Sequence, residues 1–298
     1  MKTISGELPM TCTICGIGRL DKTFIETRDI ITGELFSLIE CDHCKVKKTH
    51  PIPDDMSRYY ETDLGEAMRK DPGKLYAALK RRLLNIELSR ITKVVKDAEF
   101  LDIGCGTGDF SRLIHEKGLK VSAVDSAFKR PAYISENNSI PYYCIDYNDY
   151  GIKGFAGMRN GVAILRHVLE HIKEPGSFIE RMLGYGANTF YVAVPNISSL
   201  KSKLLGQYCW HLDPPRHVWH FDHNSLDLFF RRLGFKVAAR GFDTIPIIVP
   251  SLYRYMRMKG VSQRVCNIFE PKGIVSTLSL PFDWILPNDI IWVIAQKG

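Results

Sequence analysis

The sequence predicts an α/β protein with a Rossmann-like sheet of seven strands, preceded by a small zinc ribbon built on four cysteines. Three observations lead to this fold class. Short apolar runs alternate with helical segments from Phe100 onward, which is typical of a mostly parallel sheet covered on both faces. Three glycines follow the first of these runs, in DIGCGTG at 102–108. Two CxxC pairs lie within the first 50 residues.

The composition is that of a folded domain. Of the 298 residues, 45% are hydrophobic and 24% are charged, which excludes an intrinsically disordered chain. We find neither a signal peptide nor an apolar stretch of about 18 residues, so we expect a cytoplasmic protein without a transmembrane segment. The net charge of +7 would suit nucleic acid, a nucleotide-sugar or an acidic membrane. Because the basic residues are scattered, we favour a solvated basic surface over nucleic-acid binding.

Residues 1–50 are predicted to form the zinc ribbon. The two CxxC pairs flank a hairpin, whose strands are expected at 22–30 and 34–41. Thiolates at this spacing surround Zn²⁺ tetrahedrally, and the metal would supply much of the folding free energy of so small a unit. The predicted metal ligands are Cys12, Cys15, Cys41 and Cys44. A disulfide pair, a redox CxxC motif and iron in the same cage are the alternatives.

A linker and a long helix are expected to follow the ribbon. Residues 51–73 are rich in Pro, Gly and Asp, which indicates a linker or a lid. The helix runs from about Lys74 to Val95, because its apolar residues recur at helical spacing. These apolar residues are Leu84, Leu88, Ile91 and Val95. We assign 74–298 to one domain.

The rest of the chain reads as alternating strands and helices. Strands are expected at 99–103, 120–124, 141–145, 161–165, 189–194, 235–241 and 289–295. Helices include 109–117, 175–185 and 224–233, the last closed by Gly234. Open sheets of this kind bind their ligands at the carboxyl edge, where the strand order reverses.

The glycines of DIGCGTG lie at that edge, where the backbone can approach a ligand closely. Their G-x-G-x-G spacing differs from the G-x-G-x-x-G of dinucleotide sites, which argues against a dehydrogenase. Asp125 ends the second strand, 21 residues after Gly104, where its carboxylate can accept hydrogen bonds from both hydroxyls of a ribose. Together with Asp102, it favours a ligand carrying a cationic amino group over a diphosphate.

Three segments resemble class I S-adenosylmethionine-dependent methyltransferases. FLDIGCGTGDFSRLIHEKGLKVSAVDSA at 100–127 is similar to their motif I and acidic loop, and RHVLEHIKEPGSFIERM at 166–182 to the segment after their fourth strand. LDPPRHVWHFDHNSLDLFFRRLGFKV at 212–237 resembles a signature of the zinc-ribbon-bearing subgroup, often found in cell-surface polysaccharide biosynthesis and natural-product pathways. The resemblance implies a seven-stranded sheet whose last strand is antiparallel.

The resemblance also implies the cofactor site. The residues that would bind S-adenosylmethionine are Asp102, Gly104, Cys105, Gly106, Gly108, Asp125, Ser126, Asp146, Tyr147, Arg166 and His167. Among them, Asp125 would hold the ribose and Asp146 would face the adenine amino group. Arg166 departs from the family pattern, in which a smaller residue is more usual.

Histidines are the candidate catalytic bases. His217, in the proline-fixed loop DPPRH, is our first choice, and its structural alternative is an imidazole bonded to backbone carbonyls. His171 is the second candidate, with capping of the VLEH turn as its alternative. Arg216 would meet a phosphate or carboxylate of the acceptor, or else form a salt bridge with Asp213. The aromatic residues that flank this loop would form an apolar wall over the acceptor or pack on the sheet; they are Trp210, Trp219 and Phe221.

The predicted function is therefore methyl transfer from S-adenosylmethionine to a hydroxyl of a sugar, a glycan precursor or a small metabolite. Carbon methylation of a nucleotide-sugar and methylation of RNA are the alternatives. The expected partner is a small-molecule, sugar or glycan-precursor acceptor, and the sequence leaves the oligomeric state open.

Overall fold

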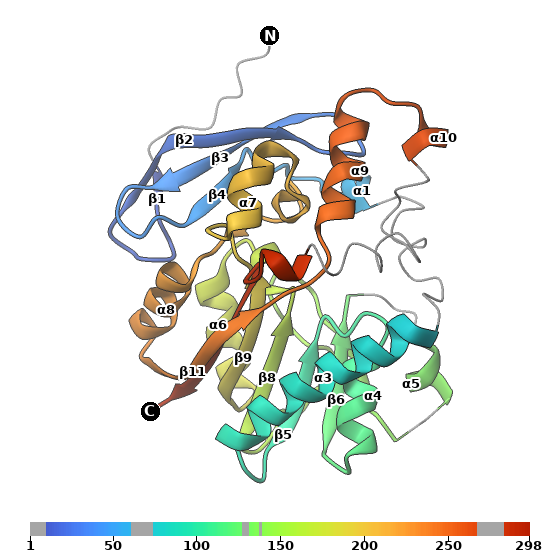
Figure 1. Cartoon of the computed structure of the whole chain (residues 1–298). Helices are drawn as coiled ribbons and strands as arrows, with labels where there is room; N and C mark the ends of the chain where they lie inside the picture. Colours follow the sequence, from blue (N-terminus) through green and yellow to red (C-terminus); the bar gives the residue numbers. More distant parts are fainter. Residues whose placement is uncertain (1–9, 61–73, 127–130, 137–138, 267–282) are drawn as a thin grey trace. The chain divides into compact units, whose positions relative to one another are not determined.

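The computed structural model describes residues 10–60, 74–126, 131–136, 139–266 and 283–298 (Figure 1). The chain forms two compact units, which are described in turn. The first consists of Met1–Tyr76, Pro195–Phe229 and Phe242–Ile291, and the second of Ala77–Val194, Phe230–Gly241 and Trp292–Gly298. Within the described residues, no helix combines the length and apolar character that crossing a bilayer requires.

The second unit is built on a sheet of seven strands in the order β11-β12-β9-β8-β5-β6-β7. The strands are β5 (Glu99–Ile103), β6 (Val121–Asp125), β7 (Tyr142–Cys144), β8 (Gly161–Arg166), β9 (Ala187–Pro195), β11 (Phe235–Asp243) and β12 (Ile290–Lys297). Their ends differ from the predicted ones by at most two residues. The predicted α/β fold class is confirmed.

Strand directions follow from the pairing. The pairs β5·β6, β6·β7, β5·β8 and β8·β9 are all parallel. The last strand runs the other way. Asn196, just after β9, donates its backbone N–H to the carbonyl of Asp289, just before β12, at 2.8 Å. Lys297, which ends β12, donates a hydrogen bond from its side-chain Nζ to the backbone carbonyl of Leu233, just before β11, at 2.6 Å. The implied antiparallel last strand is thus present.

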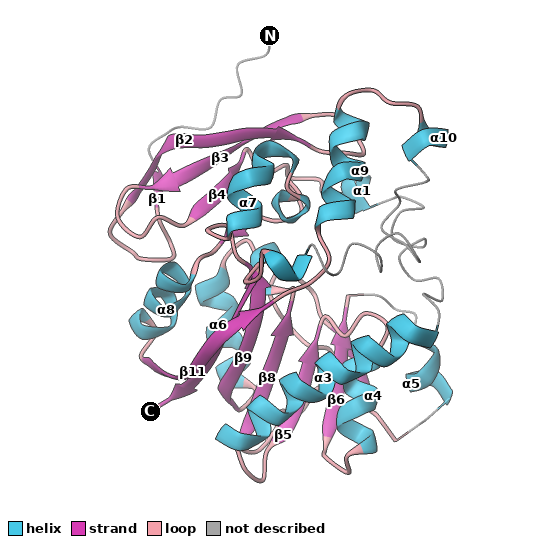
Figure 2. Cartoon of the chain, viewed as in Figure 1, coloured by secondary structure: helices cyan, strands magenta, loops and turns pink. Residues whose placement is uncertain are grey.

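Both faces of this sheet are covered. In β8 and β9, runs of consecutive residues are buried, as happens when side chains on both faces pack against helices. Figure 2 shows the helices that alternate with the strands. They are α3 (Lys74–Val94), α4 (Asp109–Glu116), α5 (Ala132–Glu136), η1 (Leu169–His171), α6 (Pro175–Gly184) and α8 (His223–Arg232). The predicted apolar residues of α3 are buried, as the helical spacing indicated.

The first unit contains a second sheet, antiparallel throughout, in the order β1-β2-β3-β4-β10. Its strands are β1 (Met10–Thr11), β2 (Arg19–Arg28), β3 (Leu35–Cys41), β4 (Lys47–His50) and β10 (Trp219–His220). The predicted hairpin is β2 and β3, with Gly33 at a positive φ of 74° in the turn between them. The sequence analysis did not predict that β10 pairs with β4.

The core of the first unit is assembled from distant parts of the chain. Leu38 of β3 packs with Ile197, Leu212 and Ile247, and a second cluster joins Ile30 to residues around Tyr253. The other helices of this unit are α1 (Ser57–Tyr60), α7 (Leu200–Leu205), η2 (Gly206–Tyr208), η3 (Trp210–Leu212), α9 (Ile248–Met258) and α10 (Gln263–Cys266). Most of the predicted linker, 61–73, lies outside the described residues, and the boundaries at 50 and 73 stay predictions.

The turn between β5 and α4 allows a stability prediction. Gly104 has φ +67°, and a Cβ added there would lie 2.6 Å from Cγ2 of Val168. Gly118 has φ +72° with nothing within 4 Å of an added Cβ, which makes it a matched control. The free energy of unfolding of Gly118→Ala should therefore fall only by the strain of a left-handed alanine, about 1 kcal/mol. For Gly104→Ala it should fall by about 2–4 kcal/mol, because the clash with Val168 adds to that strain.

Urea denaturation of the two variants and the unsubstituted protein measures these free energies of unfolding. Equal losses for the two variants would contradict the prediction, because they would mean that Val168 moves aside at no cost.

Candidate functional site

A sharp glycine turn links β5 to α4 at the carboxyl edge of the seven-stranded sheet. Gly104, Gly106 and Gly108 have φ values of +67°, +54° and +78°. The backbone N–H groups of Gly104 and Cys105 both donate to the carbonyl of Val124 in β6, at 2.8 and 3.1 Å. The turn is therefore fixed against the neighbouring strand. It lies where the chain order reverses between β5 and β8, which is the usual ligand position in open α/β sheets.

The three glycines have different surroundings. A Cβ at Gly104 would meet Val168, and a Cβ at Gly108 would lie 3.1 Å from Ile134. An added Cβ at Gly106 would meet only the carbonyl oxygen of Gly104, at 4.0 Å. Gly104 and Gly108 are thus required by packing as well as by backbone conformation. Among the described residues, no side chain lies within 4 Å of a Cβ added at Gly106, so at this position they leave the backbone open to a ligand.

Asp125, the last residue of β6, is held against this turn. Its Oδ2 accepts a hydrogen bond from the N–H of Gly106 at 2.8 Å, and its Oδ1 accepts one from the N–H of Ser126 at 2.7 Å. The hydroxyl of Ser126 also donates to Oδ1, over a longer distance of 3.4 Å. The predicted neighbours Gly106, Asp125 and Ser126 are therefore brought together by the fold.

Asp102, in β5, is buried beneath the turn. Its Oδ2 accepts a hydrogen bond of 2.6 Å from the hydroxyl of Ser111 in α4. Burial raises the pKa of Asp102 to about 6, while the hydrogen bond from Ser111 and the charge of Arg166 act in the opposite direction. A cationic group brought near this carboxyl would favour its ionised form. Asp102 thus adds a proton-sensitive acid to the floor of the site.

Arg166, which ends β8, has a partner that the sequence did not indicate. Its Nε donates to Glu87 of α3 at 2.6 Å, and Nη2 donates to the other carboxylate oxygen at 3.3 Å. The guanidinium also lies 5.0 Å from the centroid of the Phe110 ring. Burial alone would lower the pKa of Arg166, but the charge of Glu87 raises it. This pairing accounts for an arginine where the family has smaller residues, and contact with a cofactor stays a prediction.

Other predicted cofactor residues lie at the same carboxyl edge. His167 follows β8 with an unusual φ of +56°, and its Nδ1 is 3.6 Å from a carboxylate oxygen of Glu170. Asp146 follows β7 and accepts hydrogen bonds from the backbone and side-chain nitrogens of Asn148, both at 2.8 Å. Tyr147, next to it, is partly exposed. Burial raises the pKa of the Cys105 thiol, which keeps it protonated at neutral pH.

The preferred candidate base, His217, belongs to the first unit. The other candidate, His171, lies in η1 of the second unit. The His217 ring is nearly buried, and its Nδ1 lies 2.8 Å from the carbonyl oxygen of His211. Because a carbonyl can only accept, Nδ1 carries a proton, and in the neutral ring Nε2 then holds the lone pair of a base. The structural alternative, an imidazole bonded to a backbone carbonyl, is also satisfied by this geometry.

Arg216 takes the structural role that the sequence left as its alternative. It forms a salt bridge with Asp213, and its Nη2 also lies 2.9 Å from Oδ1 of Asp29 in the β2–β3 turn. Its Nη1 donates to the carbonyl of Tyr59 at 2.8 Å. Burial would raise the pKa of Asp213, but the charge of Arg216 outweighs it and lowers that pKa. Trp219 is likewise buried, packing in the sheet as β10.

The four cysteines of the ribbon converge on one point. All four are buried as free thiols, with Sγ atoms within 4.8 Å of one another. Cys12 and Cys44 are 3.7 Å apart and Cys15 and Cys41 are 3.8 Å apart, measured between sulfurs. Sulfurs bound at about 2.3 Å to one tetrahedral Zn²⁺ lie about 3.8 Å apart, so the donor set fits zinc.

The comparisons with known proteins place the chain in a family. A family model described as a methyltransferase domain matches residues 68–240, more than half of the chain. The chain therefore belongs to the methyltransferase-domain family, and the protein is a transferase enzyme. A comparison with curated proteins found no match.

Solved structures with a similar fold include two methyltransferases. One is a SAM-dependent methyltransferase from Archaeoglobus fulgidus, with a TM-score of 0.47 and 19% identity over 73% of this chain and 94% of that one. The other is magnesium protoporphyrin IX methyltransferase from Synechocystis PCC 6803 with bound SAH, with a TM-score of 0.49 and 13% identity over 79% and 94%. Because both scores are below 0.5, the assignment rests on the family match.

Proposed function

We propose that this enzyme takes its methyl group from S-adenosylmethionine, bound over the glycine turn of the second unit. The observation that carries the proposal is the hydrogen bond of 2.8 Å between the N–H of Gly106 and the carboxylate of Asp125. This bond holds the Asp125 carboxylate beside the backbone of Gly106, which no side chain of the described residues covers. A nucleoside can lie against Gly106 while its ribose hydroxyls donate to Asp125.

The acidic residues near the turn also suit the methionine end of this cofactor. The methionine part carries an ammonium group, and the carboxyl groups of Asp102, buried in β5, and Asp125, at the end of β6, would supply negative charge near the turn. When bound, S-adenosylmethionine would supply a methyl group on a sulfonium, open to in-line attack. The chain's own residues would bind the cofactor, orient the reacting atoms and exclude water from them.

The ribose assignment is tested by paired substitutions of Asp125. Asp125→Asn keeps an oxygen that can accept from Gly106 but removes the charge, and Asp125→Ala removes both. Because a hydrogen bond to a charged acceptor contributes about 1.5–3 kcal/mol, we expect affinity for S-adenosylmethionine to fall about tenfold or more for Asn and further for Ala. Isothermal titration calorimetry measures both.

Asp97→Asn is the matched control. Asp97 precedes β5, at the opposite edge of the sheet, and its φ of +50° is one that asparagine tolerates. This variant should bind the cofactor like the unsubstituted protein. Unchanged affinity in Asp125→Ala would refute the ribose assignment.

We further propose oxygen methylation, with a hydroxyl of a sugar, glycan precursor or small metabolite as acceptor and His217 as the base. The acceptor oxygen would form its bond to the methyl carbon as the carbon–sulfur bond breaks, and its proton would pass to Nε2 of His217. The bond of Nδ1 to the carbonyl of His211 supports this role, because it favours the tautomer that a base needs. Asp102, Cys105, Asp146, Tyr147, Arg166 and His167 remain the other proposed cofactor contacts.

A His217→Asn variant separates catalysis from structure. The asparagine amide can still donate to the carbonyl of His211, so the loop should hold, but it cannot accept a proton at neutral pH. We expect turnover to fall about 100-fold or more, the typical contribution of a general base, with cofactor affinity unchanged. Mass spectrometry of acceptors incubated with S-adenosylmethionine labelled in its methyl group measures the rate. His115→Asn, in α4, is the control, and full activity of His217→Asn would assign the base elsewhere.

We also propose that the four-cysteine cluster holds a structural Zn²⁺. The spacing of the sulfurs supports zinc, and Gly18 adds a constraint, because a Cβ there would lie 2.4 Å from the sulfur of Cys41. Purified protein should carry about one zinc per chain by metal analysis, and Cys44→Ser should lose most of it. Cys144→Ser, outside the ribbon, should keep its zinc. Iron in the purified protein, or zinc content unchanged in Cys44→Ser, would contradict this.

A further inference from the structure

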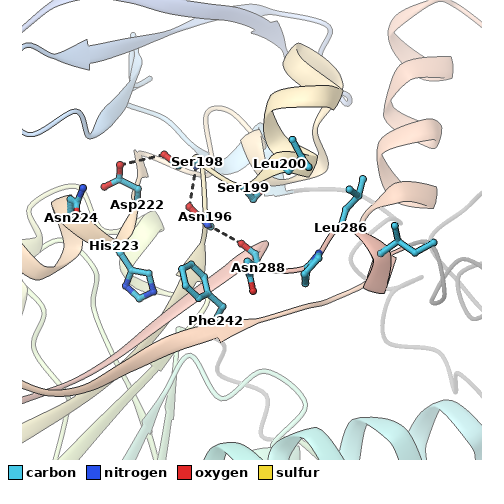
Figure 3. A pocket seen from close by; sticks show the side chains of 12 residues that line it. Asn196, Ser198, Ser199, Leu200, Asp222, His223, Asn224, Phe242, Leu286 and Asn288 are labelled. Atoms are coloured by element: carbon cyan, nitrogen blue, oxygen red, sulfur yellow. Dashed lines mark hydrogen bonds between the residues drawn. The ribbon is translucent and has the colours of Figure 1, made fainter.

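A cavity in the first unit is lined by none of the residues proposed for the cofactor, the base or the metal. Its volume is about 510 Å³, within the usual range of small-molecule sites. It is lined by the loop after β9, the start of α8, the end of β11 and the segment that leads into β12 (Figure 3). None of these lining residues is a catalytic, cofactor-binding or metal-binding residue predicted from the sequence.

A network of hydrogen bonds fixes the wall of this cavity. Asn196, which is almost fully buried, donates from its carboxamide to the backbone carbonyl of Asn288 at 2.8 Å and accepts from the N–H of Ser198 at 3.0 Å. The hydroxyl of Ser198 donates to Oδ2 of Asp222 at 3.3 Å. Asp222 also accepts from Ser225 through its other oxygen, at the start of α8. Figure 3 shows this chain of bonds from Asp222 to Asn288. The wall is thus rigid before any ligand binds.

Polar groups remain for a ligand on this fixed wall. Asn288 forms hydrogen bonds through its backbone N–H, which donates to the hydroxyl of Thr244, and through its backbone carbonyl, which accepts from Asn196. Its carboxamide and that of the exposed Asn224 each offer both donors and an acceptor. A sugar hydroxyl is also donor and acceptor at once, so carboxamides match vicinal hydroxyls in either direction.

The charge of the lining argues against ionic ligands. Among the described residues that line the cavity, none is a lysine or an arginine, so they offer a phosphate or a nucleotide no ammonium or guanidinium group. Asp222 is the one carboxylate among them, and it already accepts from Ser198 and Ser225. A multivalent cation would need more oxygen ligands of this kind. The chemistry that remains is that of a neutral, hydroxyl-rich molecule.

An aromatic ring completes the cavity. Phe242 is 46% exposed. The imidazole of His223 stands perpendicular to its ring, with 4.5 Å between the ring centroids. This contact fixes the position of the Phe242 ring, and the exposed part of the ring lines the cavity. Pyranose rings carry a patch of C–H groups that packs on such an apolar surface, while their hydroxyls reach polar groups around it.

We propose that this cavity is a saccharide-binding site, with Phe242 as the platform for a pyranose ring and the carboxamides of Asn224 and Asn288 as hydroxyl partners. The proposal goes beyond methyl transfer, because the site would recognise sugar units whether or not they are the residue that is methylated. It rests on groups of the first unit alone, so it holds or fails independently of the cofactor site.

The test uses the full-length protein and the methyl glycosides of glucose, galactose, mannose, rhamnose and N-acetylglucosamine as probes. Saturation-transfer difference NMR, with each glycoside added alone, reports which ring protons touch the protein. We expect at least one glycoside to bind, with Phe242→Ala and Asn288→Gly each weakening it tenfold or more. Glycine suits the φ of +73° at Asn288, so that variant removes the carboxamide without straining the backbone.

Phe24→Ala is the matched control, because Phe24 is 47% exposed in β2 and does not line the cavity. It should bind the glycosides like the unsubstituted protein. The proposal would be overturned if none of the five glycosides bound, or if Phe242→Ala and Asn288→Gly bound them as well as the unsubstituted protein does. Calorimetry with S-adenosylmethionine on the same samples separates the two hypotheses, since the cavity variants should keep their cofactor affinity.

Discussion

The second unit depends on a backbone constraint, the left-handed conformation of three residues out of five between β5 and α4. A side chain in that conformation costs about 1–2 kcal/mol, so glycine is required at each position. The turn ends β5 at the sheet edge, directs α4 back along the sheet, and aims the N–H of Gly106 at Asp125. It also brings Ser111 of α4 to Asp102, and this hydrogen bond partly offsets the rise in the pKa of Asp102 that burial causes.

The first unit is held by a different kind of interaction. The buried guanidinium of Arg216 joins the turn of the ribbon hairpin, through Asp29, to the DPPRH loop, through Asp213. Removing one member of such a network leaves an unpaired buried charge, so the three groups stabilise the unit only together. The motif that resembles a family signature thus acts, in this chain, as a structural tie for the ribbon. His217 follows Arg216 directly and is positioned by the same loop.

Local patterns in the sequence predicted much of the fold. Most of the seven strands are short apolar runs, and the glycine turn and both CxxC pairs have fixed spacings, so these elements could be predicted without three-dimensional information. The strand β11 is the exception, with Lys236 and Arg240 among its residues. The pairing of β4 with β10 was missed, because strands of four and two residues carry too little pattern and their contact spans most of the chain. Glu87 was missed for a similar reason, since a polar residue on a helix gives no sign that it meets Arg166. The lining of the saccharide cavity comes from four separate segments, none of which has a motif.

The late arrival of β10 has a consequence for synthesis on the ribosome. The ribbon's sheet lacks its last strand until Trp219 and His220 emerge, long after β4 (Lys47–His50) has been made. At about 5–20 residues per second, this interval lasts about 10–30 s. During it, β4 is an open edge that could pair with other nascent chains. Lys48 places a positive charge on that edge, whereas Lys47 is buried and paired with Glu40. Charged edges resist such pairing.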